Sequence, residues 1–587
     1  MSRFRFLALA VLALPALALA QVGAAPPSDA IRYRLIVDGP NPTAKALREG
    51  LDLARWETDE EMTLDLLERL VKDAVPQAKE IAAIEGFYDA RVDVTIERDA
   101  RPVVVRVRVE PGPATRVKSV DLTVVGPAAT DVPAGTTAAT EARDGWGLRL
   151  GEVFRQSQWV EAKAEALRTM RRGPYAAARI SDSEARVEPD TQSAALRVEI
   201  DSGPPFRIGD VAVRGVQRYR ADLVRNFSTL KRGAPYSQAA LDDYVRRLAA
   251  SGYFTSVQAV IDPETTNPDD ATVDVAVIEA PTHRVEGAIS FSTDTGYGAR
   301  ASYTNIDIDR NALQMRLEGR LESRQQLAQA TFTWPPGPSQ WIDSLRVGAQ
   351  RRDIENTVET TGVVGVERRG IDERRHPVFG AAFYYDRQEP ERAPSTSSHA
   401  TYVEAGYVLR RVDDLVSPTR GWMTDLRAGV GVPGLSSESF VRVVALSQAW
   451  YPIDRVTGLV LRGEAGAVVG ASRENVPSVL RFRTGGDTTV RGYAYRSLGV
   501  QLGEGIVAGR YYALASAEVV RWINETIGIA TFVDAGDATD ELGDFRFALG
   551  YGVGARIRTP VGPFRIDLAY GERTRDVRLH FSVGLAF

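Results

Sequence analysis

The stretch FRFALGYGVGARIRTPVGPFRIDLAYGERTRDVRLHFSVGLAF, residues 545–587, carries the strongest indication of the fold. Within each of its three segments an apolar or aromatic residue stands at every second position, and Arg, Asp, Gly or Ser often stands between. Such alternation is typical of β-strands with one apolar face and one polar face. Pro560–Pro563 and Gly571–Arg575 separate the segments as turns. The stretch therefore predicts three consecutive antiparallel strands.

The same alternation extends back to Pro281, in segments such as EGAISFST, QMRLEGRLE and TYVEAGYVLR, and gives sixteen segments in all. Residues 285–587 number 303, or about 19 for each strand with its turn. That spacing fits a sixteen-stranded antiparallel transmembrane β-barrel with an apolar exterior and a polar lumen. A soluble sandwich would bury its inner faces and would not place Arg and Glu at alternate positions. The chain also ends on an aromatic residue, Phe587.

The first twenty residues predict a secretory signal peptide. Arg3 and Arg5 precede the apolar run from Phe6 to Leu19, and Ala18-Leu19-Ala20 is a small-x-small cleavage motif. The chain has no Cys, so neither a lipoprotein anchor nor a disulfide is expected. No later stretch reaches the roughly 18 apolar residues of a membrane helix, whereas a barrel strand needs only about 9–11.

Three short blocks repeat before the barrel half. GFYDARVDV, GPYAAARI and GYFTSVQAV begin at Gly86, Gly173 and Gly252, which are 87 and 79 residues apart. Each block follows a helical pattern and precedes, some twenty residues later, a β-rich segment. This period suits a tandem array of small β-α-α-β-β domains. The predicted domains are the signal peptide (1–20), three repeats (30–114, 115–204 and 205–281) and the barrel (282–587).

Composition excludes several classes of function. The net charge is −5 and becomes −7 if the two cations of residues 1–20 are removed, so no nucleic-acid partner is expected. The four histidines are scattered and no Cys joins them, so no zinc site is expected. No Ser-His-Asp set, activated Cys or carboxylate pair suggests an enzyme, and no cofactor is predicted.

The glycines at 550, 552 and 554 lie within an alternating segment, which excludes a dinucleotide fingerprint. There they would let another group pack closely against the lumen wall.

Three motifs in the barrel half occur together. VRGY, Val490–Tyr493, lies in the longest connection, roughly residues 471–509. FVDAG, Phe532–Gly536, lies at the expected end of a strand, with a solvated turn expected after Asp534. GVGARIRTPVGPFRIDLAY, Gly552–Tyr570, follows. Their order before a terminal Phe in an exported β-rich chain is more specific than any one of them.

With these motifs, residues from about 30 to 587 resemble the BamA/TamA superfamily of outer-membrane assembly proteins. The resemblance implies periplasmic POTRA (polypeptide-transport-associated) domains before a sixteen-stranded barrel. It also implies a long extracellular loop that folds back into the lumen and sets its V-R-G-F/Y tip against the F-x-D-x-G strand. Three repeats make the chain most similar to the TamA (translocation and assembly module) branch. Tyr493 stands where many members have Phe, a neutral difference if the ring only packs.

The resemblance implies that Arg491 pairs with Asp534 and stacks on Phe532, with Glu518 as a second anion. A guanidinium in a narrow lumen is costly unless it is paired and hydrogen-bonded, so the pairing also has a physical basis. Gly492 allows close approach of the backbone to the wall. The candidate residues of this loop latch are Val490, Arg491, Gly492, Tyr493, Glu518, Phe532, Asp534 and Gly536.

The expected function is that of an outer-membrane insertase for β-barrel or autotransporter clients, with membrane lipid as surroundings and a periplasm-spanning TamB-like partner implied by the resemblance. A lateral seam between the first and last strands would open to clients. Gly287 and Gly584 weaken those strands, which end at Phe587. One alternative is a two-partner-type secretion pore that passes its substrate through the lumen. A more distant alternative is a passive porin.

Overall fold

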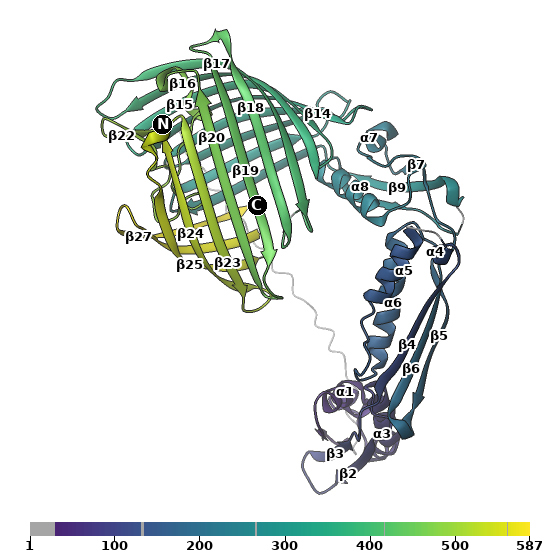
Figure 1. Cartoon of the computed structure of the whole chain (residues 1–587). Coiled ribbons are helices and arrows are strands. Elements are labelled where there is room, and N and C mark those ends of the chain that lie inside the picture. Colours follow the sequence, from purple (N-terminus) through teal and green to yellow (C-terminus); the bar gives the residue numbers. More distant parts are fainter. Residues whose placement is uncertain (1–29, 131–133, 265–266, 416, 560–561, 587) are drawn as a thin grey trace, which may run out of the picture. The chain divides into compact units, whose positions relative to one another are not determined.

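The computed structural model describes residues 30–130, 134–264, 267–415, 417–559 and 562–586 (Figure 1). The predicted signal peptide and Phe587 lie outside the described residues. The chain divides into two compact units, residues 1–206 and residues 207–587. No helix in the described residues has both the length and the hydropathy needed to cross a membrane.

Two small α/β domains form the first unit. In each, the last strand of the domain lies in the middle of a three-stranded sheet, parallel to the first strand and antiparallel to the second. The first domain consists of β1 (Tyr33–Asp38), α1 (Thr43–Gly50), α2 (Asp52–Arg55), α3 (Leu64–Ile84), β2 (Arg91–Glu97) and β3 (Val103–Glu110). The second consists of β4 (Arg116–Val125), α4 (Pro127–Thr130), α5 (Ala134–Asp144), α6 (Gln156–Arg172), β5 (Arg179–Glu188) and β6 (Ser193–Asp201).

Alternation along the central strand builds the core of the first domain. Val103, Val105 and Val107 of β3 are all buried, while the residues between them are less buried. The buried valines join Leu67 and Ala78 of α3 in one hydrophobic cluster. Burial of such side chains is the main term that stabilises a domain of this size, because each buried Val contributes about 1.5–3 kcal/mol. The pattern of β3 thus fixes which sheet face the helices cover.

A third domain with the same order of elements begins the second unit. Its sheet has the strand order β7-β9-β8. Tyr253 donates a 2.5 Å hydrogen bond to the carbonyl of Ala312, and Gln314 Nε2 donates one of 2.8 Å to the carbonyl of Ser251, so the domain contacts the barrel at the start of β12. The elements are β7 (Ile208–Arg214), α7 (Ala221–Asn226), α8 (Gln238–Ala250), β8 (Phe254–Val260) and β9 (Ala271–Glu279).

Sixteen strands within the described residues form a closed antiparallel barrel, which confirms the predicted fold. They are β10 (His283–Ser292), β11 (Gly296–Asn305), β12 (Gln314–Glu322), β13 (Gln325–Trp334), β14 (Trp341–Ile354), β15 (Thr357–Gly370), β16 (Arg375–Pro390), β17 (Thr396–Val412), β18 (Gly421–Ser436), β19 (Phe440–Pro452), β20 (Thr457–Val469), β23 (Tyr511–Trp522), β24 (Ile527–Thr539), β25 (Ala548–Thr559), β26 (Gly562–Gly571) and β27 (Asp576–Ala586).

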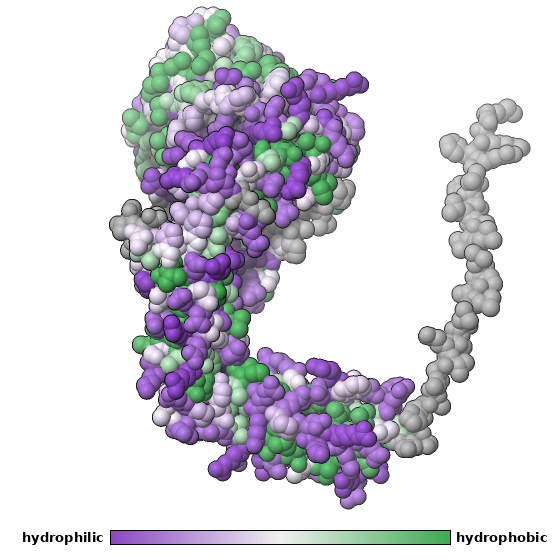
Figure 2. Space-filling model, turned by 90° about the vertical axis from the view of Figure 1, so that its right-hand side faces the viewer, coloured by the Kyte–Doolittle hydropathy of each residue, from purple (hydrophilic) through white to green (hydrophobic). Residues whose placement is uncertain are grey.

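The side chains of the barrel strands alternate between its two faces as the sequence predicts. Val364 and Val366 of β15 are 49% and 54% exposed on the outer face, while Glu359, at an odd position of the same strand, is buried in the lumen. Apolar residues form patches on the part of the barrel wall seen in Figure 2, where they stand beside hydrophilic ones. The outer face therefore suits lipid and the inner face suits polar contacts.

The first and last strands close the barrel with a short junction, which we call the seam. Among the described residues, Ala288–Ser292 of β10 pair with Ser582–Ala586 of β27 in five residue pairs, and the N–H of Thr293 donates to the carbonyl of Phe581 at 3.1 Å just beyond them. β10 pairs with β11 over ten residue pairs. Within the described residues, the seam is therefore shorter than the pairing on the other side of β10.

Candidate functional site in the barrel lumen

The connection between β20 and β23, residues 470–510, is the lumen loop. It contains two 3-10 turns, Arg473–Asn475 and Ser478–Leu480, and a small hairpin of β21 (Val500–Leu502) and β22 (Gly505–Val507). Gly485, Gly486 and Gly492 of this loop all have positive φ, so its backbone departs from an extended strand and can bend into the barrel. Val490, Arg491 and Tyr493 are at most 6% exposed, which places the tip of the loop inside the lumen.

The guanidinium of Arg491 is held from three sides. Its Nε lies 2.7 Å from Asp534 Oδ2 and its Nη2 lies 2.9 Å from Asp534 Oδ1, so the two groups meet through two parallel hydrogen bonds. Nη1 donates to Glu518 Oε2 at 2.6 Å. The carbon of the guanidinium lies 3.4 Å from the centre of the Phe532 ring. The planar fork of Arg thus uses its edges for carboxylates and its face for an aromatic ring.

A second arginine completes the charge cluster. Arg556 of β25 contacts Glu518 at 2.7 Å and Asp567 of β26 at 2.6 Å. Nη1 of Arg491 also lies 3.3 Å from Asp567 Oδ2. Two guanidinium groups and three carboxylates therefore share one buried site, where each charge has several partners. A network of this kind offsets the cost of taking ions out of water better than an isolated pair does.

Three glycines of β25 make the space that the cluster needs. A Cβ on Gly550 would lie 1.8 Å from the carbonyl oxygen of Arg491, and one on Gly552 would lie 2.8 Å from the Phe532 ring. A Cβ on Gly554 would lie 1.8 Å from Asp567 Oδ1. The groups that pack closely against the lumen wall at these glycines are thus the Arg491 backbone, the Phe532 ring and the Asp567 carboxylate. The loop backbone and the charge cluster occupy the space that side chains would fill.

Gly492 and Tyr493 fix the loop tip to the last strands. Gly492 has a φ of +91°, and a Cβ there would lie 2.7 Å from the amide nitrogen of Gly571. Its N–H donates to Nε2 of His580 at 2.9 Å. The Tyr493 hydroxyl donates to the carbonyl of Leu549 at 2.9 Å and accepts from the N–H of Arg573 at 2.9 Å. The Tyr hydroxyl therefore makes hydrogen bonds that a Phe at this position cannot make.

The loop tip also reaches the turn after the first barrel strand. The N–H of Asp487 donates to Asp294 Oδ2 at 3.0 Å, and Asp294 lies between β10 and β11. Burial, together with repulsion by the neighbouring Asp294 carboxylate, raises the pKa of Asp487 to about 7. With Gly492 bound to His580 of β27, the loop touches both sides of the seam.

The stem of the loop is anchored on the opposite wall of the lumen. Ser478 donates from its N–H and its hydroxyl to the two carboxylate oxygens of Asp386, both at 2.8 Å. Arg481 Nη2 donates to Gln388 Oε1 at 2.6 Å. Both acceptors belong to β16, across the lumen from β24 and β25. The loop therefore bridges the lumen and obstructs it.

The structure brings the eight candidate latch residues into one region. Val490 packs against Gly536, because a Cβ added to Gly536 would lie only 2.7 Å from Val490 Cγ2. Of the seam residues, Gly584 pairs with Ser290 of β10 and Gly287 pairs with Ala301 of β11, whereas Phe587 lies outside the described residues. Whether these residues act as a latch and a seam stays a prediction.

One expectation about this region is wrong. The FVDAG motif does not end its strand and no solvated turn follows Asp534, because β24 continues to Thr539 and Asp537 is 4% exposed. Asp537 Oδ2 accepts from the N–H of Arg546 at 2.8 Å. The carboxylate of Asp537 thus accepts a hydrogen bond from the backbone that follows the strand. This hydrogen bond offsets part of the cost of burying the carboxylate.

Arg556, Asp567 and His580 were not among the residues expected in the site. Arg556 and Asp567 lie within the third motif and at positions whose alternation points to the lumen, so the sequence did contain a signal for them. His580 follows the same alternation in the last strand. What the sequence lacks is the information that these positions meet Arg491 across three neighbouring strands.

Comparison with known proteins agrees with this architecture. The Omp85 superfamily domain matches residues 284–587, and the POTRA domain (surface antigen variable number repeat) matches residues 206–279. The outer membrane protein assembly factor BamA of Neisseria meningitidis is 22% identical over 517 residues, which are 75% of this chain and 64% of that protein. BamA of Nitratidesulfovibrio vulgaris is 24% identical over 415 residues, 65% of this chain and 51% of that protein.

The chain thus spans less than two thirds of the length of these relatives. The crystal structure of BamA from Haemophilus ducreyi lacking POTRA domains 1–3 shares the fold, with a TM-score of 0.54, 14% identity and coverage of 80% of this chain and all of that one. The barrel lies in an outer membrane and the POTRA domain in the periplasm. Because the matched barrel domain covers more than half of its residues, this chain belongs to the Omp85 superfamily.

Proposed function

We propose that this protein assists the insertion of other β-barrel or autotransporter proteins into the outer membrane through its seam. The action is non-covalent and involves no enzymatic step. A client strand pairs with the edge of β10 or β27 when the seam opens, as an extended segment adds to an exposed sheet edge. The curated relatives are named as assembly factors, and that similarity supports the proposal.

The observation that carries the proposal is the seam itself. In the part of the chain that the structure describes, its five residue pairs are fewer than the ten of the neighbouring β10–β11 pairing. The lumen loop contacts both sides of it, through Asp487 at Asp294 and through Gly492 at His580. Release of the loop would remove both contacts at once and lower the cost of opening.

A disulfide across the seam tests the proposal. Ser290 and Gly584 are direct partners in the register, and cross-strand partners lie about 4.5–5.5 Å apart at their Cα atoms, within the range a disulfide needs. The chain has no native Cys to compete. The variant Ser290→Cys with Gly584→Cys is reconstituted in vesicles, and the folding of an unfolded autotransporter barrel is followed by its heat-modifiable migration on gels. Oxidation should stop the acceleration of client folding, and reduction should restore it.

The matched control places a disulfide where no opening is proposed. Ala328 of β13 and Ala349 of β14 are direct partners on the outer face, and the pair Ala328→Cys with Ala349→Cys should leave activity unchanged when oxidised. Full activity of the oxidised seam variant would contradict the proposal. Passage of a polypeptide through a seam-locked barrel would then favour the secretion pore, and passage of small solutes alone would favour the porin.

A periplasm-spanning TamB-like partner and membership of the TamA branch stay predictions. The N-terminal sheets offer edge strands, of which β5 in the second domain has mostly exposed residues. We propose this kind of edge as the binding site for clients and partner in the periplasm, because unpaired backbone groups accept a further strand. Crosslinking in native membranes followed by purification should recover partner and client together.

A further inference from the structure

The outer face of the barrel carries an ion pair where lipid is expected. Arg368 Nε lies 2.7 Å from Asp343 Oδ1, and Arg368 Nη2 lies 2.9 Å from Asp343 Oδ2. The two residues are direct partners of β15 and β14. Arg368 stands at an even position of β15, as do the exposed Val364 and Val366, so the pair faces outward. Lumen charges need no special explanation, but a charged pair on the lipid face does.

The pair lies at the periplasmic end of its strands. Asp343 is the third residue of β14, and Arg368 is the third from the end of β15. The turn after β15 contacts the third domain, because Glu373 lies 3.8 Å from Arg246. A charge on the lipid face costs about 2–4 kcal/mol at the centre of a bilayer but only about 0–1 near its surface. The pair therefore sits at the depth of lipid headgroups.

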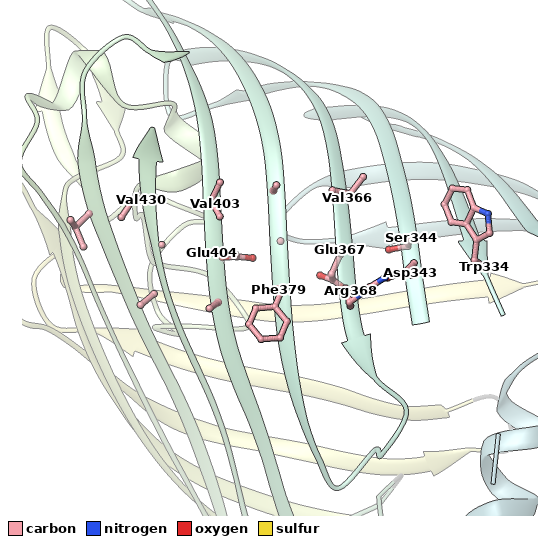
Figure 3. A pocket seen from close by; sticks show the side chains of 16 residues that line it. Trp334, Asp343, Ser344, Val366, Glu367, Arg368, Phe379, Val403, Glu404 and Val430 are labelled. Atoms are coloured by element: carbon pink, nitrogen blue, oxygen red, sulfur yellow. Dashed lines mark hydrogen bonds and ion pairs between the residues drawn. The ribbon is translucent and has the colours of Figure 1, made fainter. Parts of the chain in front are cut away.

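An apolar groove of about 810 Å³ continues from the pair across the neighbouring strands (Figure 3). Side by side from strand to strand, Arg368 pairs with Phe379, Phe379 with Ala405 and Ala405 with Ala428. The two alanines keep the floor low, while Val403 and Val430 border it. Figure 3 shows Trp334 on the Asp343 side of the ion pair and Phe379 on the Arg368 side. A Trp at this depth is typical of a membrane interface.

We propose that this groove binds one phosphatidylethanolamine molecule of the periplasmic leaflet. The headgroup carries a phosphate and an ammonium, which complement Arg368 and Asp343 respectively. Within the described part of the chain, Arg368 Nη1 has no hydrogen-bond partner, so it can donate to the phosphate without breaking the pair. An acyl chain then lies over Ala405 and Ala428. The binding site is separate from the lumen loop and the seam.

Binding is measured by native mass spectrometry of the full chain in detergent, titrated with phosphatidylethanolamine or phosphatidylglycerol. Arg368→Gln should weaken both lipids roughly fivefold, because both carry the phosphate. Asp343→Asn should weaken phosphatidylethanolamine by a similar factor and leave phosphatidylglycerol no weaker, because only the former has an ammonium. Ala405→Trp should weaken both by filling the groove. Heat-modifiable migration shows that each variant is folded.

Two controls separate a built site from ordinary surrounding lipid. Arg351 lies on the outer face at the other end of β14, and Arg351→Gln should change neither affinity. Leu321→Trp adds a large ring at an exposed position of β12, which supplies no residue to the groove lining, and should also have no effect. Equal losses in the controls, or unchanged binding in Arg368→Gln, would overturn the proposal. A photoreactive residue in place of Val403 should capture lipid in native membranes, and capture of a protein instead would also overturn it.

Discussion

Arg491 and Asp534 lie 43 residues apart in the chain and meet inside the barrel through two hydrogen bonds of 2.7 and 2.9 Å. Asp534 is fully buried, and it also accepts from the Ser516 hydroxyl at 2.6 Å and from the N–H of Arg491 at 3.1 Å. The carboxylate thus has four donors, all directed at it from the loop and from β23. Three of these four hydrogen bonds come from Arg491, so the contacts that dock the loop are also the ones that replace water around this buried carboxylate.

Loss of either partner should therefore release the loop. Removing one member of a buried ion pair costs about 3–5 kcal/mol, because the other charge stays buried. Arg491→Ala and Asp534→Ala should each expose residues 470–510 to protease and raise ion conductance in planar bilayers. Arg491→Lys should rescue poorly, since Lys lacks the planar fork and cannot bind Asp534 and Glu518 in the same geometry. Arg455→Ala, in an exposed turn, is the matched control. Wild-type protection in Arg491→Ala would contradict the latch.

Tyr493→Phe should weaken docking although the ring is kept. The hydroxyl joins the carbonyl of Leu549 to the N–H of Arg573, and its removal leaves both groups without that partner. A cost of about 1–3 kcal/mol follows, or at least a severalfold rise in cleavage rate within the loop. Tyr297→Phe, on the exposed outer face, should leave the rate unchanged. Identical rates for Tyr493→Phe and wild type would show that the ring alone holds the tip.

The barrel could be predicted from sequence because its period is local. Every second residue from Phe545 to Ile557 and from Val577 to Phe581 is apolar, and this alone assigns the two faces. The end of β24 could not be predicted in the same way. Asp537 reads as a turn residue, yet it lies in the strand because its carboxylate binds the backbone of Arg546. A tertiary contact overrides the local preference there.

The charged residues around Arg491 were likewise predicted only in part. Asp534 and Glu518 were expected from the family resemblance, whereas Arg556 and Asp567 were not. Gly554 and Asp567 are direct partners in the register of β25 and β26. Arg556, two positions after Gly554 on the same face, therefore reaches Asp567. That register depends on the stagger of the whole barrel, which no single segment encodes. The sequence can therefore state which face a charge occupies but not which charges meet.

Gly550→Ala should also release the loop, without changing any charge. The added Cβ would lie 1.8 Å from the carbonyl oxygen of Arg491, so the loop or β25 must move. Small shifts of this backbone displace the guanidinium from Asp534 and Glu518, so protease cleavage within the loop should rise as it does in Arg491→Ala. Gly463→Ala is the matched control, because a Cβ on Gly463 of β20 meets no described atom within 4 Å. Equal protection of both variants would mean that the wall yields without cost.

Docking of the loop should weaken as the pH rises through the range in which Asp487 loses its proton. The pKa of Asp487 is about 7 in the docked loop and returns to an ordinary value near 4 when the loop is released. The docked state therefore binds this proton more tightly, so docking is favoured at low pH, weakens from about pH 4 to about pH 7 and changes no further above that.

Asp294 and His580 also face this region, so the test compares wild type with Asp487→Asn rather than one profile alone. Asn cannot ionise and keeps a donor toward Asp294. Loop cleavage should rise with pH in wild type and much less in Asp487→Asn, which at pH 8 should be protected as well as wild type at about pH 4. The protease is chosen for constant activity across this range, and an unfolded peptide of the loop sequence corrects for what remains. Parallel profiles of the two proteins would show that Asp487 is not the group that couples pH to docking.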